Sequence, residues 1–159
     1  MKRMRPTLIA LLVGMLGLAF MLTGAQAQDD EHILGYRQKV MKSMGASMGA
    51  IGDILKHKLP FAGHIGVHAG DISRMSAVIA ESFEKEITEG RTDAKPDVWQ
   101  DWDKFVAAAE TLQEEGAKLA DIASGGDMAA IGAQVKNLGK ACGDCHKPFR
   151  KPKEERFQR

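Results

Sequence analysis

The sequence predicts an all-α protein, an antiparallel four-helix bundle. Apolar residues recur at helical steps of three and four in four separate segments, whereas strand-type alternation of apolar and polar residues is almost absent. The connections between the segments are short, and amphipathic helices joined in this way bury their apolar stripes best as antiparallel neighbours about 20° apart. A length of 159 residues with 44% hydrophobic residues fits one compact domain.

The amino-terminal segment differs from the rest of the chain. Basic residues come first, an apolar run follows over 8–22, and Ala25-Gln26-Ala27 then provides the small residues that a signal peptidase accepts. We therefore predict a signal peptide at 1–27, export to the periplasm and a mature domain at 28–159. A retained membrane anchor is the alternative, since the run is only slightly shorter than the roughly 18 residues of a spanning helix.

Charge restricts the choice of partners. Cleavage after Ala27 removes Lys2, Arg3 and Arg5 and no acidic residue, which changes the formal charge from +1 to −2. A nearly neutral balance argues against nucleic acid as the main partner. After cleavage we expect no membrane span.

The first helix of the mature domain is predicted over 30–58. Its buried stripe follows from residues spaced by three or four, with Met41 beside them: Val40, Met44, Met48, Ile51 and Leu55. Leu59-Pro60 ends this helix, and the glycines within 63–70 predict a loop up to Asp71. Asp71 is then expected to cap a second helix, with an apolar face formed by Ile72, Met75, Ile79 and Phe83.

The third and fourth helices follow two polar connections. The connection over 89–96 leads into the third helix, whose apolar side is predicted to hold Trp99, Trp102, Val106, Ala109 and Leu112. Asp127 is expected to cap the fourth helix after Ser124-Gly125-Gly126. Its apolar seam comprises Met128, Ile131, Val135, Leu138, Cys142, Cys145 and Phe149, so both cysteines belong to the buried side.

Cys142-Gly143-Asp144-Cys145-His146 has the C-x-x-C-H spacing of c-type haem attachment. Residues three and four apart are neighbours on a helix, so two sulfurs can bond one haem while the adjacent imidazole binds its iron. The motif predicts one haem c, covalently attached through Cys142 and Cys145, with His146 as axial iron ligand. A thioredoxin-like dithiol is one alternative, and buried or disulfide-bonded cysteines with an incidental histidine are another.

A second axial ligand is expected on the first helix. In an antiparallel bundle the end of the fourth helix lies level with the start of the first, where Met41 and Met44 occur. A thioether raises the reduction potential of the iron and suits an electron carrier. Met41 is the first candidate and Met44 the second, while core filling is the alternative for both.

Three motifs together resemble the cytochrome c′ family, the class II c-type cytochromes: Tyr36-Arg37-Gln38, Pro96-Asp97-Val98-Trp99 and the C-x-x-C-H motif near the carboxyl end. The resemblance covers nearly the whole mature chain and implies the four-helix fold. It also implies that Met41 lies over the distal haem face, where low-spin members use methionine as a ligand and five-coordinate members hold an apolar side chain.

The resemblance extends to two arginines and to assembly. It implies that Arg37 lies near the haem edge, where it could pair with a propionate, and that Arg150 follows the ligand histidine by one turn. A solvated surface position is the alternative for both, and Pro148 predicts a break in the last helical turn. The family's dimers, together with Gly45, Gly49 and Gly52 on one stripe of the first helix, indicate a homodimer; simple tolerance of the glycines is the alternative.

These observations predict a periplasmic electron carrier rather than an enzyme, transferring single electrons to and from redox partners with His146 and Met41 as iron ligands. The alternative is a five-coordinate haem protein that binds nitric oxide or carbon monoxide. Dithiol exchange by the two cysteines is a third hypothesis. The basic tail either steers an acidic redox partner or is a solvated terminus; its cations are Lys147, Arg150, Lys151, Lys153, Arg156 and Arg159.

Overall fold

The computed structural model describes residues 6–157, and their side chains from Gln28 onward. This part of the chain contains no β-strand, which confirms the predicted all-α class. Its helices are α1 (Pro6–His57), α2 (His64–Ser76), α3 (Ile79–Phe83), α4 (Asp97–Gln100), α5 (Trp102–Ser124), α6 (Met128–Phe149) and the 3₁₀ helix η1 (Lys153–Glu155).

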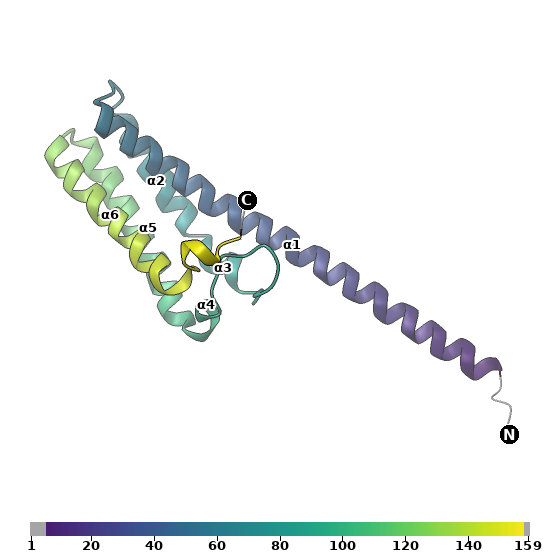
Figure 1. Cartoon of the computed structure of the whole chain (residues 1–159). Helices are drawn as coiled ribbons and strands as arrows, with labels where there is room; N and C mark the ends of the chain where they lie inside the picture. Colours follow the sequence, from purple (N-terminus) through teal and green to yellow (C-terminus); the bar gives the residue numbers. More distant parts are fainter. Residues whose placement is uncertain (1–5, 158–159) are drawn as a thin grey trace.

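Helices α1, α2, α5 and α6 form the bundle, and α3 and α4 lie at one end of it (Figure 1). Helix α1 packs on α2, α2 on α5, and α5 on α6. Gly66 of α2 lies beside Ala120 and Ala123 of α5, while Ser73, further along α2, lies beside the earlier Gly116, so these two helices are antiparallel. The first part of α1 extends well beyond the other helices (Figure 1).

The core lies between these four helices, and all of them supply fully buried aliphatic side chains. The largest are Ile51, Ile65, Ile72, Leu119, Ile131 and Leu138. Met41, Met48, Cys142 and Cys145 are partly buried and pack against this core. The predicted apolar seams of the first and fourth helices are therefore confirmed, except that Met128 is exposed.

The predicted loop over 63–70 is wrong, because α2 already begins at His64. Ile65, Ala69 and Ile72 are buried and follow the helical spacing, so packing against the bundle outweighs the low helix propensity of the glycines. Asp71 lies inside α2 and pairs with Arg74 instead of capping a helix. The second predicted helix is also interrupted, since α2 ends at Ser76 and α3 begins at Ile79.

The third predicted helix is divided into α4 and α5 at Asp101, whose backbone is not helical. The predicted apolar side is confirmed for Ala109 and Leu112, which are buried, and for Trp99 and Trp102, which pack against the core. Only Val106 is wrong, because the buried residue at this turn is Phe105. The cap of the fourth helix is confirmed, because a side-chain oxygen of Asp127 accepts hydrogen bonds from the amides of Ala129, at 2.9 Å, and Ala130, at 3.2 Å.

The predicted leader at 1–27 lies outside the residues whose side chains are described, and it stays a prediction. Its cleavage site would fall within α1, which is continuous from Pro6 to His57. Between Gln28 and Phe157, no helical stretch is long and apolar enough to cross a membrane.

Candidate haem site

A cavity of about 410 Å³ lies between α1 and α6, at the end of the bundle near α3 and α4. Direct packing joins α1 to α2 and α3, and α6 to α5 and α4, which leaves the seam between α1 and α6 open. The lining is mostly apolar and includes Met41, Met44, Phe83, Phe105 and Leu112. Such a cavity can enclose a flat, largely apolar cofactor.

Cys142, Cys145 and His146 all line this cavity, as the motif predicts. Both cysteines are free thiols and half-buried. Burial raises the pKa of both thiols, and the neighbouring Cys142 adds to the effect at Cys145, whose pKa reaches about 11. Dithiol exchange needs a depressed thiol pKa, so this environment argues against that hypothesis.

His146 lies in the last turn of α6, where its imidazole borders the cavity. Burial of part of the ring lowers its pKa, and the nearby cations Arg150 and Arg156 lower it further. The imidazole is therefore neutral at pH 7 and offers a nitrogen lone pair, which is the form that binds a metal.

Met41 and Met44 both line the cavity, but their surroundings differ. Met44 is 7% exposed, and its Sδ atom lies 3.6 Å from the buried Ser76 hydroxyl. Met41 is half-buried, and its sulfur has no hydrogen-bond partner among the described residues. Of the two, Met41 has the sulfur that is free to turn toward a ligand in the cavity.

Arg37 is 3% exposed, so the alternative of a solvated surface position is wrong. Its Nε donates to the carbonyl of Ser82 at 2.6 Å, and its Nη2 donates to the carbonyl of Lys85 at 2.5 Å. The guanidinium also lies over the Phe83 ring, 4.5 Å from its centroid. Nη1 of Arg37 is buried and has no hydrogen-bond partner among the described residues. Arg37 also lines the cavity.

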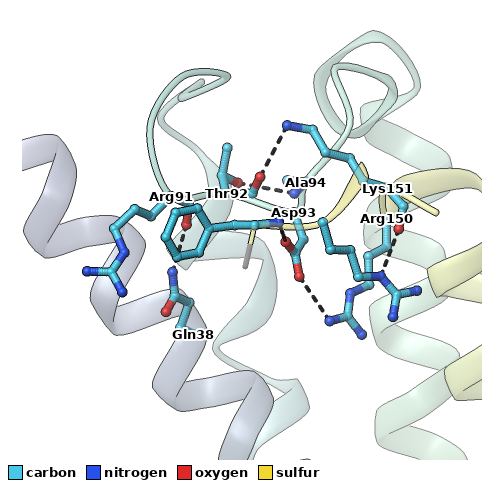
Figure 2. A network of polar contacts seen from close by, with 9 residues as sticks. Gln38, Arg91, Thr92, Asp93, Ala94, Arg150 and Lys151 are labelled. Carbon is cyan, nitrogen blue, oxygen red and sulfur yellow. Dashed lines mark hydrogen bonds and ion pairs between the residues drawn. The ribbon is translucent and has the colours of Figure 1, made fainter. Parts of the chain in front are cut away.

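Arg150 also lines the cavity, and Asp93 holds it there. Arg150 Nη2 donates to Asp93 Oδ2 at 3.0 Å, as Figure 2 shows. Pro148 does not end the helix early, because α6 runs to Phe149 and the amide of Arg150 still donates to the carbonyl of His146 at 3.0 Å. The proline occupies the last turn, where the lost hydrogen bond disturbs little.

Sequence reasoning missed Asp93, which joins the loop over 91–94 to the carboxyl-terminal tail. Its Oδ1 accepts from the Phe157 amide at 3.0 Å, and its carbonyl accepts from the Lys151 amide at 2.8 Å. Polar loops between helices are ordinary surface features, so the sequence gives little reason to single out a residue within this one. The signals that could have indicated a structural role for Asp93 are its charge and its place shortly before Pro96.

The lining residues fit a haem c. Two thiols and a neutral imidazole, grouped in the last turns of α6, are the groups that could form the covalent bonds and bind the iron. The unpartnered Nη1 of Arg37 is the strongest indication, because a buried cationic N–H group without an acceptor is costly. A haem propionate would supply that acceptor.

Comparisons with known proteins agree with this site. The family model described as cytochrome c′ matches residues 32–150. The cytochrome c′ of Rhodospirillum rubrum is 35% identical over 152 residues, which cover 94% of this chain and 99% of that protein. The solved cytochrome c′ structure from Shewanella frigidimarina has a TM-score of 0.72 and 29% identity, covering 77% of this chain and 97% of that one.

Two further matches are structures of cytochrome c′ variants from Alcaligenes xylosoxidans. A nitric oxide complex has a TM-score of 0.69 and 29% identity, covering 78% of this chain and 97% of that one. A carbon monoxide complex has a TM-score of 0.68 and 28% identity, covering 77% of this chain and 97% of that one. Each of these two relatives thus binds a diatomic gas.

Proposed function

Because this chain belongs to the cytochrome c′ family, we propose that its single covalently attached haem c binds a diatomic gas, nitric oxide or carbon monoxide, inside the cavity between α1 and α6. The haem supplies an iron that changes between the ferrous and ferric states and accepts such a gas. Cys142 and Cys145 hold the haem, His146 is the protein's axial ligand, and Arg37 and Arg150 lie where they can pair with its propionates.

The observation that carries this proposal is the apolar interior of the cavity. Three of its polar side chains have partners: Gln38 donates to the Arg91 carbonyl at 2.7 Å, Thr92 accepts from the Ala94 amide at 3.1 Å, and Arg150 pairs with Asp93. The unpartnered Nη1 of Arg37 is the donor that we assign to a haem propionate. A gas held beside Met41, Phe83 and Leu112 would therefore meet carbon and sulfur atoms. Such a pocket favours nitric oxide and carbon monoxide over dioxygen, whose bound form needs a hydrogen-bond donor.

Electron transfer with Met41 as sixth ligand is the second candidate function, and the sequence alone favoured it. The observation that supports it is that Met41 lines the same cavity as His146, while the sulfur of Met44 contacts the Ser76 hydroxyl. The nitric oxide and carbon monoxide complexes of the relatives give more support to gas binding. Neither function requires a catalytic side chain.

The absorption spectrum of the ferrous holoprotein, recorded before and after carbon monoxide is added, distinguishes the two functions. Gas binding predicts a broad high-spin spectrum whose absorption bands shift when carbon monoxide is added in an amount equal to that of the haem. A sharp low-spin spectrum that carbon monoxide leaves unchanged would overturn gas binding and support ligation by Met41. The Met41→Ala variant provides the control. If Met41 is the sixth ligand, this variant should gain carbon monoxide binding. If Met41 does not bind the iron, the variant should bind carbon monoxide as the wild type does.

We also propose export and dimer formation, which the family membership supports. Purified periplasmic protein should begin at Gln28, as measured by the intact mass of the haem-bound chain. Gly45, Gly49 and Gly52 are exposed, and no described atom lies within 4 Å of their Cβ positions. Gly45 also lines the haem cavity, so Gly49 and Gly52 are the positions where a second α1 could approach closely. Sedimentation of the wild-type protein and of the Gly49→Leu variant tests this interface, since the bulkier side chain should shift a dimer toward monomer.

A further inference from the structure

The cavity opens to solvent beside positively charged side chains. Of the residues that line it, Lys42, Arg91 and His146 are exposed, and Arg150 is half-buried. Asp93 is the one carboxylate among the described lining residues, and it pairs with Arg150. The cations Lys147, Lys151 and Arg156 lie on the adjoining end of α6 and the tail. We call these six cations the basic rim: Lys42, Arg91, Lys147, Arg150, Lys151 and Arg156.

Neutral groups, rather than carboxylates, hold most of the rim in place. Lys151 Nζ donates to the Thr92 carbonyl at 3.2 Å, and Arg156 Nε donates to the Lys151 carbonyl at 2.9 Å. The Arg91 guanidinium lies over the Phe157 ring, 4.8 Å from its centroid. Within the described part of the chain, Arg150 is the only rim cation with an ion pair. The other five form no ion pair with a described residue.

The Asp93 network brings these cations together from segments that are distant in sequence. Figure 2 shows Gln38 of α1, the loop from Arg91 to Ala94, and Arg150 with Lys151 of the tail linked by hydrogen bonds. An isolated antiparallel bridge between Ala94 and Arg150 adds backbone support. The rim is thus a built feature of the fold and not a frayed basic tail.

The rim also contrasts with the charge of the whole molecule. The chain over 28–159 carries a formal charge of −2, because the three cations of the predicted leader are absent from it. Glu154, Glu155 and two haem propionates reduce the positive charge near the cavity, but with Arg37 and Lys153 included the region stays net positive. A local positive region on an acidic molecule orients it in the field of an approaching anion.

We propose that the basic rim docks an acidic surface of a one-electron donor protein, which reduces the haem at the cavity opening. In this step the donor's redox centre loses one electron and the ferric iron gains it, with no bond made or broken. Carbon monoxide binds only ferrous haem, so carbon monoxide binding requires such a donor. The inference rests on the haem of the proposed function, but it holds whichever ligand occupies the sixth position.

The test measures oxidation of the ferrous holoprotein by two small reagents of opposite charge, ferricyanide and tris(phenanthroline)cobalt(III). The rim variant is Lys42→Glu with Lys147→Glu, because neither lysine side chain makes a polar contact within the described chain and both are exposed. The matched control is Lys56→Glu with Lys136→Glu, which changes the net charge equally near the opposite end of the bundle. Lys151→Glu is a second, independent rim variant.

At low ionic strength the rim variant should lower the ferricyanide rate about tenfold and raise the cobalt rate, and high salt should remove both effects. The control should stay within about twofold of the wild type. As a protein donor, reduced flavodoxin, which is acidic, should show the same loss of rate with the rim variants. Equal effects in the rim and control variants, or rates independent of salt, would overturn the docking surface. A wild-type protein without haem absorption would instead refute the proposed function.

Discussion

Arg37 shows how a single residue links the fold to the cofactor. A guanidinium that is 3% exposed is tolerated because the carbonyls of Ser82 and Lys85 accept two of its donors and the Phe83 ring lies against its face. Burial lowers its pKa, while the charge of Asp30 opposes that shift. Arginine nevertheless stays protonated in proteins, so the cavity contains a permanent positive charge.

Replacing Arg37 with methionine should lower the free energy of unfolding of the holoprotein by about 2–4 kcal/mol, because two buried carbonyls and the proposed propionate lose their donor. Guanidinium denaturation followed by circular dichroism measures this change. Arg74→Met is the control: Arg74 pairs with Asp71 on the surface, where such pairs contribute less than about 1 kcal/mol. Equal losses in the two variants would contradict the role given to Arg37.

At the scale of helices, α2 and α5 approach each other closely at Gly116. A Cβ atom at this position would lie 3.0 Å from the Ser73 amide nitrogen and 3.2 Å from the Ala69 carbonyl oxygen, both of them backbone atoms. Glycine is therefore required for the spacing of these helices, although it lowers the intrinsic helix propensity of α5.

Gly116→Ala should destabilise the protein by roughly 1–3 kcal/mol, because α2 and α5 must move apart to admit the methyl group. Gly132→Ala in α6 should instead stabilise it by about 0.5–1 kcal/mol, since nothing lies within 4 Å of the added carbon and only propensity changes. Thermal unfolding of both variants provides the comparison. Stabilisation by Gly116→Ala would show that the two helices separate without cost.

The sequence was sufficient for the helical class, the cap at Asp127 and the placement of Cys142, Cys145 and His146, because each depends on local spacing. It was insufficient for the start of α2, where packing of Ile65 and Ala69 outweighs the low helix propensity of Gly66 and Gly70. Contacts between distant segments, such as the pairing of Asp93 with Arg150, leave no local pattern.

At the scale of the whole molecule, the Asp93 network closes the bundle by attaching the tail to the loop before α4. Asp93→Ala removes the acceptor of Arg150 and of the Phe157 amide, and it should lower the free energy of unfolding by about 1–3 kcal/mol. Trypsin should then cleave the freed tail after Lys153 and Arg156 faster than in the wild type, whereas the bond after Lys151 is protected by Pro152 in both proteins. Asp97→Ala serves as the control, because Asp97 faces Lys95 at 3.5 Å with both side chains partly exposed. Unchanged cleavage of the Asp93 variant would show that other contacts hold the tail.

The cavity between α1 and α6 makes the fold depend on its cofactor. An empty apolar cavity lowers the free energy of unfolding by about 24 cal/mol per Å³. For a volume of about 410 Å³ the loss is at most about 10 kcal/mol, which is comparable with the whole stability of a typical domain. Water entering the open side reduces this loss, but α1 and α6 have little direct contact to replace the missing packing. The haem-free chain should therefore relax rather than keep its cavity.

The variant Cys142→Ser with Cys145→Ser, purified without haem, should keep most of its far-ultraviolet helical signal and lose the near-ultraviolet signal of its packed aromatic rings. Its unfolding should be broad rather than cooperative, because the helices persist while Phe83, Phe105 and Phe149, which pack together beside the cavity, lose their fixed arrangement. The Cys142→Ser variant is the control, since Cys145 can still form one thioether. Cooperative unfolding of the haem-free variant at the midpoint of the holoprotein would mean that α1 and α6 close the seam by themselves, and the cavity would then be a consequence of haem binding rather than a feature of the folded chain.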